Sequence, residues 1–142
     1  MSGSAEALCG TAAIERLAKA RYGQDLTAHE VIVTAREGRD FLSCQVMAEI
    51  GTHVGHLLAI LSPIFFPQRI LVTGGTAEAG EPLMKAVRGS YQSLIGSYMA
   101  ELTRLESGVL RSVEILKGSL GPDAAIVGTT LAFFNLEDSV GG

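Results

Sequence analysis

The stretch from Arg69 to Gly80 most constrains the fold, because two structural patterns meet in it. A short apolar run, Ile70–Val72, ends at two adjacent glycines and indicates a buried β-strand. After the glycines, apolar residues recur at the spacing of a helix face: Leu83, Met84, Val87, Tyr91, Leu94 and Ile95. The sequence therefore predicts a strand, a glycine turn and a helix with Glu78 and Glu81 in its first turn.

The glycine turn is also a candidate binding site. Glycines let a ligand approach the backbone closely, and ligands of open α/β sheets bind beyond the carboxyl ends of the strands. Gly74 and Gly75 lack the third glycine of the dinucleotide-binding motif and the Gly-Lys-Ser/Thr of a Walker loop. A plain connection between a strand and a helix is therefore the alternative interpretation.

Three helices are predicted before this turn, over residues 11–22, 27–35 and 41 to about 62. A capping box of Thr27 and Glu30 begins the second helix, and Asp40 caps the third. On the third helix, Met47, Gly51 and Gly55 are spaced four residues apart and form a flat patch where another helix can approach closely.

The chain after the turn supplies a second strand. The helix that follows the glycines is predicted to reach about Gly96 and to continue, frayed, towards Leu105. Val113, Ile115 and Leu116 indicate a strand within residues 111–117. A long helix links the two strands, so they are predicted to be parallel. A final helix is predicted to begin at Pro122.

Composition limits the function classes. The chain has 142 residues, enough for one domain over 1–142, and residues 1–5 and 137–142 are predicted to be disordered. Net charge is −4 without a basic cluster, which argues against nucleic acid and anionic membranes as partners. The longest apolar tract, Val54–Phe66, is too short to span a bilayer. Cys9 and Cys44 are predicted to be buried, reduced thiols of a cytoplasmic protein.

Few residues suggest catalysis or metal binding. His53 and His56 share a helix face, with Glu49 one turn away, so a metal site is conceivable. Polar or partner-facing residues of an ordinary helix are the favoured explanation for them. The aspartates fall at helix starts or in loops, where capping accounts for them. We therefore predict no catalytic residue and no metal ligand in this chain.

Three stretches together resemble the ROK family of bacterial sugar kinases and sugar-responsive repressors. The longest is Gly55–Gly80, which includes the predicted strand and glycine turn. Leu120–Gly128 resembles the start of that family's C-terminal helix. Gly3–Leu8, followed by Thr11–Ile14, resembles the segment that closes the family's zinc motif. The resemblance covers residues 3 to 135, in order.

The resemblance implies a partial ribonuclease-H-like, actin-like ATPase fold, helix-rich α/β, of which this chain is the C-terminal half. It implies that Gly74, Gly75 and Thr76 lie beside the adenosine of ATP, although kinases of the family often have three glycines there. It also implies that Glu6 contacts sugar hydroxyls. Ser4 stands where a zinc-binding cysteine is expected, so no zinc is predicted.

The phosphate-binding loop and catalytic aspartate of the family belong to its N-terminal half, which this chain lacks. The resemblance therefore implies the adenosine-binding and dimerisation half of a sugar kinase, not competent alone, with ATP and Mg²⁺ bound only together with a complementary N-terminal half. The alternative is a non-catalytic sugar-sensing or interaction domain of a ROK-type regulator. A homodimer is expected, through an exposed sheet edge and the patch at Met47, Gly51 and Gly55.

Overall fold

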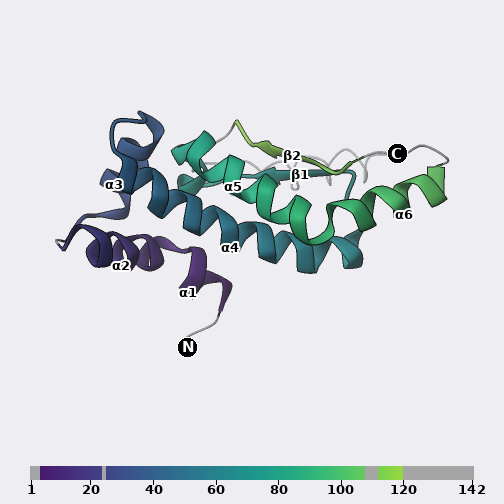
Figure 1. The fold of residues 1–142 in the computed structure, drawn as a ribbon, viewed down its shortest axis with the longest axis horizontal. Coiled ribbons are helices and arrows are strands. Elements are labelled where there is room, and N and C mark those ends of the chain that lie inside the picture. Colours follow the sequence, from purple (N-terminus) through teal and green to yellow (C-terminus); the bar gives the residue numbers. More distant parts are fainter. Residues whose placement is uncertain (1–3, 24, 108–111, 120–142) are drawn as a thin grey trace, which may run out of the picture.

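The computed structural model describes residues 4–23, 25–107 and 112–119 (Figure 1). Their elements, in chain order, are α1 (Ala5–Cys9), α2 (Thr11–Tyr22), α3 (Ala28–Arg36), α4 (Phe41–Phe65), β1 (Arg69–Val72), the 3-10 helix η1 (Gly75–Ala79), α5 (Glu81–Tyr91), the π-helical turn η2 (Gln92–Gly96), α6 (Ser97–Ser107) and β2 (Glu114–Lys117). Ser4 and Ala5, assigned by the sequence to a disordered start, form the N-cap and first residue of α1. The helix predicted from Pro122 lies outside the described residues.

Helix α4 is the centre of the structure. In Figure 1, α1 and α2 lie along one side of α4, and α5 and the two strands lie along the other. Val46, Met47 and Ile50 of α4 are fully buried in the core. Each neighbouring helix thus covers a different part of the apolar surface of α4, although Phe41, Ile60 and Ile64 remain exposed.

Two glycines on α4 let α5 approach its backbone. A Cβ atom at Gly51 would lie 2.5 Å from the Leu83 carbonyl oxygen, and one at Gly55 would lie 2.7 Å from the Val87 carbonyl oxygen. The predicted close approach at these glycines is confirmed, but the approaching helix belongs to the same chain. The prediction that the patch at Met47, Gly51 and Gly55 serves a dimer is therefore wrong, because α5 and the core already cover it.

The sheet consists of two parallel strands, as predicted. Ile70 is paired with Ile115, and the register continues in step from Arg69–Glu114 to Val72–Lys117. Ile70, Val72 and Ile115 pack against the core. Alternate residues of a strand point to opposite faces, so Leu71 lies on the outer face and is 59% exposed.

The predicted helix caps are present. The Thr27 hydroxyl accepts from the Glu30 amide, and the Glu30 carboxylate accepts from the Thr27 amide at 2.8 Å. The Asp40 carboxylate accepts from the Ser43 amide at 2.6 Å. These short-range bonds need only residues three positions apart, which explains why the sequence predicts them.

Helix α4 ends later than predicted. It continues past Pro63 to Phe65, and Phe66 ends it in the left-handed region with φ of 48°. Proline in the last turn removes only the bond to the Ala59 carbonyl, so the helix persists until the next proline, Pro67. By length and composition α4 could also cross a membrane. Val46, Met47 and Ile50 of α4 lie in the core, whereas Ile60, Ile64 and Phe65 near its C-terminus are exposed.

The cysteines are less buried than predicted. Cys9 and Cys44 are both free thiols at half-buried positions. The Cys44 thiol donates to the Ala35 carbonyl at 3.6 Å. Partial burial raises the pKa of the Cys9 thiol, because the thiolate is desolvated there. Both groups therefore pack as small hydrophobes between helices.

The glycine contact can be tested by adding one methyl group. We expect Gly51→Ala to lower the free energy of unfolding by about 1–3 kcal/mol, because the new Cβ collides with the α5 backbone and forces α4 and α5 apart. Gly89→Ala on α5 is the matched control. Its Cβ meets nothing within 4 Å, so this change should raise stability by about 0.4–1 kcal/mol. Urea unfolding followed by circular dichroism measures both, and an unchanged Gly51→Ala protein would contradict the contact.

The capping carboxylate of α4 gives a second test, through pH. The Tyr22 hydroxyl and then the Ser43 amide, both donating to Asp40, lower the pKa of its carboxyl. The stabilisation from Asp40 is therefore complete above its unfolded pKa of about 3.9 and is lost as the pH falls through the lower folded value. We expect Asp40→Asn, which keeps a capping side chain, to flatten the acid loss of unfolding free energy. Asp25→Asn removes an exposed carboxylate paired with Lys19 and should leave the acid slope nearly unchanged.

Candidate functional site

The glycine turn lies where β1 ends and is built from backbone that only glycine readily adopts. Gly74 has φ of 95° and Gly80 has φ of 69°, and η1 lies between them. L-residues rarely adopt either conformation. The turn also differs from the predicted one: Gly80 separates η1 from α5, so Glu81 is in the first turn of α5 whereas Glu78 belongs to η1.

The outer side of this turn is open. Gly75 is exposed, its φ is not in the left-handed region, and a Cβ atom there would meet nothing within 4 Å. Thr76 is half-buried beside it, whereas Ala77 and Ala79 of η1 are buried in the interior. A flat molecule can therefore reach the backbone of Gly74 and Gly75 without displacing a side chain.

The end of β2 forms a second wall beside the turn. The Gly118 amide donates to the Val72 carbonyl at 2.9 Å, which keeps the two strands paired up to the turn. A Cβ atom at Gly118 would lie 2.4 Å from Cγ2 of Thr73, so glycine is needed there for close approach. Lys117 is joined to Glu78 of η1 by an ion pair of 3.2 Å. This pair fixes η1 against β2.

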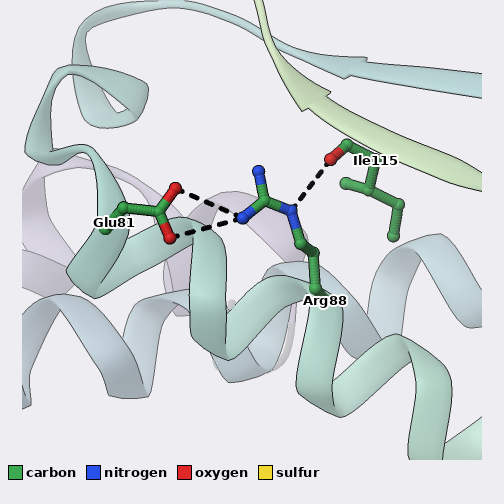
Figure 2. Close-up of polar contacts among 3 residues, drawn as sticks. All are labelled: Glu81, Arg88 and Ile115. Atoms are coloured by element: carbon green, nitrogen blue, oxygen red, sulfur yellow. Dashed lines mark hydrogen bonds and ion pairs between the residues drawn. The ribbon is translucent and has the colours of Figure 1, made fainter.

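Arg88 connects α5 to β2. Its Nε donates to the Ile115 carbonyl at 3.0 Å, and its Nη1 lies 3.2 Å from Oε1 of Glu81 (Figure 2). One guanidinium thus joins the first turn of α5 to the outer edge of β2. The start of α5 and β2 are therefore held together on the side of β2 away from β1.

Glu6 is in a separate place. It is an exposed residue in the first turn of α1, and its carboxylate has no hydrogen-bonding or charged partner among residues 4–23, 25–107 and 112–119. Figure 1 places α1 across α4 from the strands and α5. The structure therefore does not bring Glu6 together with Gly74, Gly75 and Thr76 into one pocket of this chain.

A cavity of about 750 Å³ lies at the opposite ends of the strands. Arg69 and Glu114, the first residues of β1 and β2, line it together with Met99 and Leu102 of α6. It is remote from the glycine turn, which follows the last residue of β1. The cavity is therefore not part of the candidate nucleotide site.

The histidine pair does not build a metal centre within the part of the chain that the structure describes, where no group of three potential ligands occurs. His53 and His56 meet edge to face, with ring centroids 6.3 Å apart. Glu49, the third candidate ligand, is instead ion-paired with Arg21 of α2. The interpretation of His53 and His56 as ordinary residues of a helix surface fits this arrangement.

Sequence reasoning missed the residues that brace the turn. Arg88 and Lys117 bond partners 27 and 39 positions away, which no local spacing reveals. The pairing of β1 with β2 in register is what brings Lys117 near Glu78. Lys117, at the end of the second predicted strand, was the only signal available for its ion pair, and nothing local indicated the role of Arg88.

Comparison with known proteins identifies the family. The model of the ROK family matches residues 1–133. Relatives include the transcriptional dual regulator NagC of Escherichia coli K12, 29% identical over 87% of this chain and 32% of the relative. They also include the repressor Mlc of the same organism, 33% identical over 49% and 17%, and a glucokinase of Halalkalibacterium halodurans, 27% identical over 72% and 28%. The chain thus spans a third or less of the curated relatives it matches.

Solved structures share the fold. A ROK glucokinase from Streptomyces griseus, solved with glucose and AMPPNP, has a TM-score of 0.68 and 23% identity over 90% of this chain and 43% of its own. A putative sugar kinase from Cytophaga hutchinsonii has a TM-score of 0.71 and 19% identity over 92% and 44%. The predicted helix-rich α/β fold of the actin-like ATPase type is therefore confirmed. With the family model covering nearly the whole sequence, this chain belongs to the ROK family.

Proposed function

We propose that this chain supplies the adenosine-binding and self-associating part of an ATP-dependent ROK sugar kinase and is not competent for phosphoryl transfer alone. The glycine turn carries the proposal. Its backbone is fixed by Gly74 and Gly80, and its outer side at Gly75 is open. The glucokinase of Streptomyces griseus, which has the same fold, was solved with a nucleotide analogue and glucose.

Adenine and ribose suit this turn better than phosphates do. Lys117 and Arg88 are already ion-paired with Glu78 of η1 and Glu81 of α5, so neither is left uncompensated to hold a triphosphate there. Exposed backbone beside glycine instead allows a flat ring to approach closely. In this proposal Mg²⁺ and the phosphates are held by a complementary N-terminal half, and Ser4 gives no basis for zinc.

The sugar side of the proposal rests on Glu6. A carboxylate that accepts sugar hydroxyl bonds forms strong, charge-assisted contacts. The Glu6 side chain is exposed and unengaged by any described residue, so it is available for such bonds. Because α1 lies across α4 from the strands, the sugar and nucleotide elements need further protein to form a continuous cleft.

A second candidate is a sugar-sensing domain of a ROK-type regulator. It is favoured by the relatives NagC and Mlc, both of which are transcriptional regulators. In that case the chain binds sugar or a protein partner and transfers no phosphate. The net charge of −4 gives this segment no surface for nucleic acid. A kinase and a DNA-binding regulator both fit the predicted cytoplasmic location.

Nucleotide binding at the turn can be tested with a valine. We expect Gly75→Val to abolish any ADP affinity that calorimetric titration detects in this chain, because the side chain fills the open side of the turn. The variant should remain folded, since its Cβ meets no neighbour and its backbone is not left-handed.

Gly89→Ala is the matched control, because Gly89 is equally open but lies on the exposed surface of α5. Equal ADP affinity of wild type and Gly75→Val would place the nucleotide elsewhere. No ADP binding by either protein would favour a pure interaction domain without a nucleotide site.

A sugar kinase assay tests whether this chain alone can transfer a phosphoryl group. We expect no ATP-dependent phosphorylation of any hexose or N-acetylhexosamine by the purified chain, because phosphoryl transfer needs a phosphate loop, Mg²⁺ and a base in position. Sugar binding, if it occurs with this chain alone, should weaken in Glu6→Gln and be unchanged in Asp25→Asn. Turnover that survives purification and is lost in Glu6→Ala would contradict the proposal.

A further inference from the structure

The 3-10 helix η1 is joined to its neighbours through a glycine at each end. Gly74, with φ of 95°, precedes it, and Gly80, with φ of 69°, separates it from α5. Glycine has more backbone freedom than any other residue, so neither connection fixes the direction of η1. The Ala77 amide donates to the Gly74 carbonyl and the Gly80 amide to the Ala77 carbonyl, both at 3.1 Å, but these bonds stay within the segment. The position of η1 therefore depends on its side-chain contacts.

Two kinds of side-chain contact hold η1. Ala77 and Ala79 are buried in the interior, where η1 packs against α3. Outside the core, Glu78 forms an ion pair with Lys117, the last residue of β2, with Nζ 3.2 Å from Oε1. The two charged side chains are only 36% and 31% exposed, so solvent screens their attraction incompletely. The buried alanines thus hold one side of η1, and the ion pair holds the other.

The end of β2 is a firm support for this ion pair. The Gly118 amide, next to Lys117, donates to the Val72 carbonyl at 2.9 Å, so β2 stays paired with β1 up to its last residue. Nε of Arg88 donates to the Ile115 carbonyl at 3.0 Å and joins β2 to α5 (Figure 2). The Lys117 side chain therefore extends from backbone that two neighbouring elements hold in place.

We propose that Lys117 is a positioning residue for nucleotide binding, which acts through Glu78 on η1. Gly75 is the first residue of η1, and the Gly74 carbonyl accepts the first hydrogen bond of that helix. A displacement of η1 therefore moves the open backbone at the turn. This inference rests on the proposed nucleotide site and names a distant residue that sets its affinity.

Lys117 acts in this proposal without touching the ligand. Its ammonium group is already paired with Glu78, and the parts of the nucleotide assigned to the turn are adenine and ribose. A residue that positions the turn should affect the binding of adenosine and of ADP equally. A residue that contacts phosphate would affect ADP alone, because adenosine has no phosphate.

Hydrogen exchange followed by NMR tests the position of η1 in the protein without ligand. Lys117→Met and Glu78→Gln each remove one charge and nearly keep the size of the side chain. We expect the Ala77 and Gly80 amides to exchange about two- to fivefold faster in both variants, the range that loss of a partly exposed ion pair allows. The Gly118 amide should stay protected, because it reports on the pairing of the strands. Lys117→Glu combined with Glu78→Lys restores the pair and should restore the wild-type rates.

Titration of the same variants with adenosine and with ADP, also followed by NMR, tests the role in binding. We expect Lys117→Met to weaken the affinity for both ligands about two- to fivefold, and the reversed pair to restore it. Arg69→Met is the matched control. It removes an ion pair of 2.8 Å with Glu114 at the opposite ends of the same strands, so it should change neither affinity.

The outcomes separate this inference from the proposed function. If the wild type binds neither ligand, the proposed nucleotide site is wrong, and the role of Lys117 in binding is wrong with it. If the wild type binds both and Lys117→Met binds them equally well, the site stands and the inference is overturned. Loss of affinity for ADP alone, or an equal loss in Arg69→Met, would also overturn it. Unchanged exchange in Lys117→Met would show that the ion pair does not hold η1.

Discussion

The contact between α4 and α5 at Gly51 and Gly55 is the constraint on which the rest of the structure depends. Carbonyl oxygens of α5 occupy the space that side chains on α4 would fill. Because α5 connects β1 to β2, its position against α4 fixes where both strands lie over the core. The position of α5 also places Arg88 at the edge of β2 and η1 beside Lys117. The candidate nucleotide site is therefore a consequence of helix packing some distance away.

The sequence predicted the helix caps and the strand, which depend on residues close together in the chain. The capping box at Thr27, the cap at Asp40 and the strand at Ile70 depend on residues within one turn or one run, and all are present. The end of α4 was placed too early, because proline in a last turn costs one hydrogen bond and does not end a helix. Apolar spacing did not predict the 3-10 helix after Gly74 or the π-helical turn at Gln92–Gly96, because it does not distinguish these forms from an α-helix.

The candidate site was predictable only in part, because neighbouring residues indicate a turn but not its detailed backbone or its distant contacts. Two glycines after a strand indicated a turn that a ligand can approach, and Gly75 is indeed open. Which glycine carries the unusual backbone was not predictable: it is Gly74, with Gly80 at the far end, whereas Gly75 has ordinary φ. The patch at Gly51 and Gly55 was correctly taken as a close contact, but pattern alone does not distinguish a helix of the same chain from one of a partner.

The division of roles within the glycine turn bears on how one fold can accommodate different activities. Gly74 and Gly80 determine the path of the backbone, whereas Gly75 and Thr76 lie between them on the accessible side. Replacements at the two inner positions change what can approach the turn without moving α5 or the strands. Under the proposed function, selection can therefore alter or remove nucleotide affinity there through side chains alone. A scaffold of this kind suits a family whose members include both glucokinases and repressors.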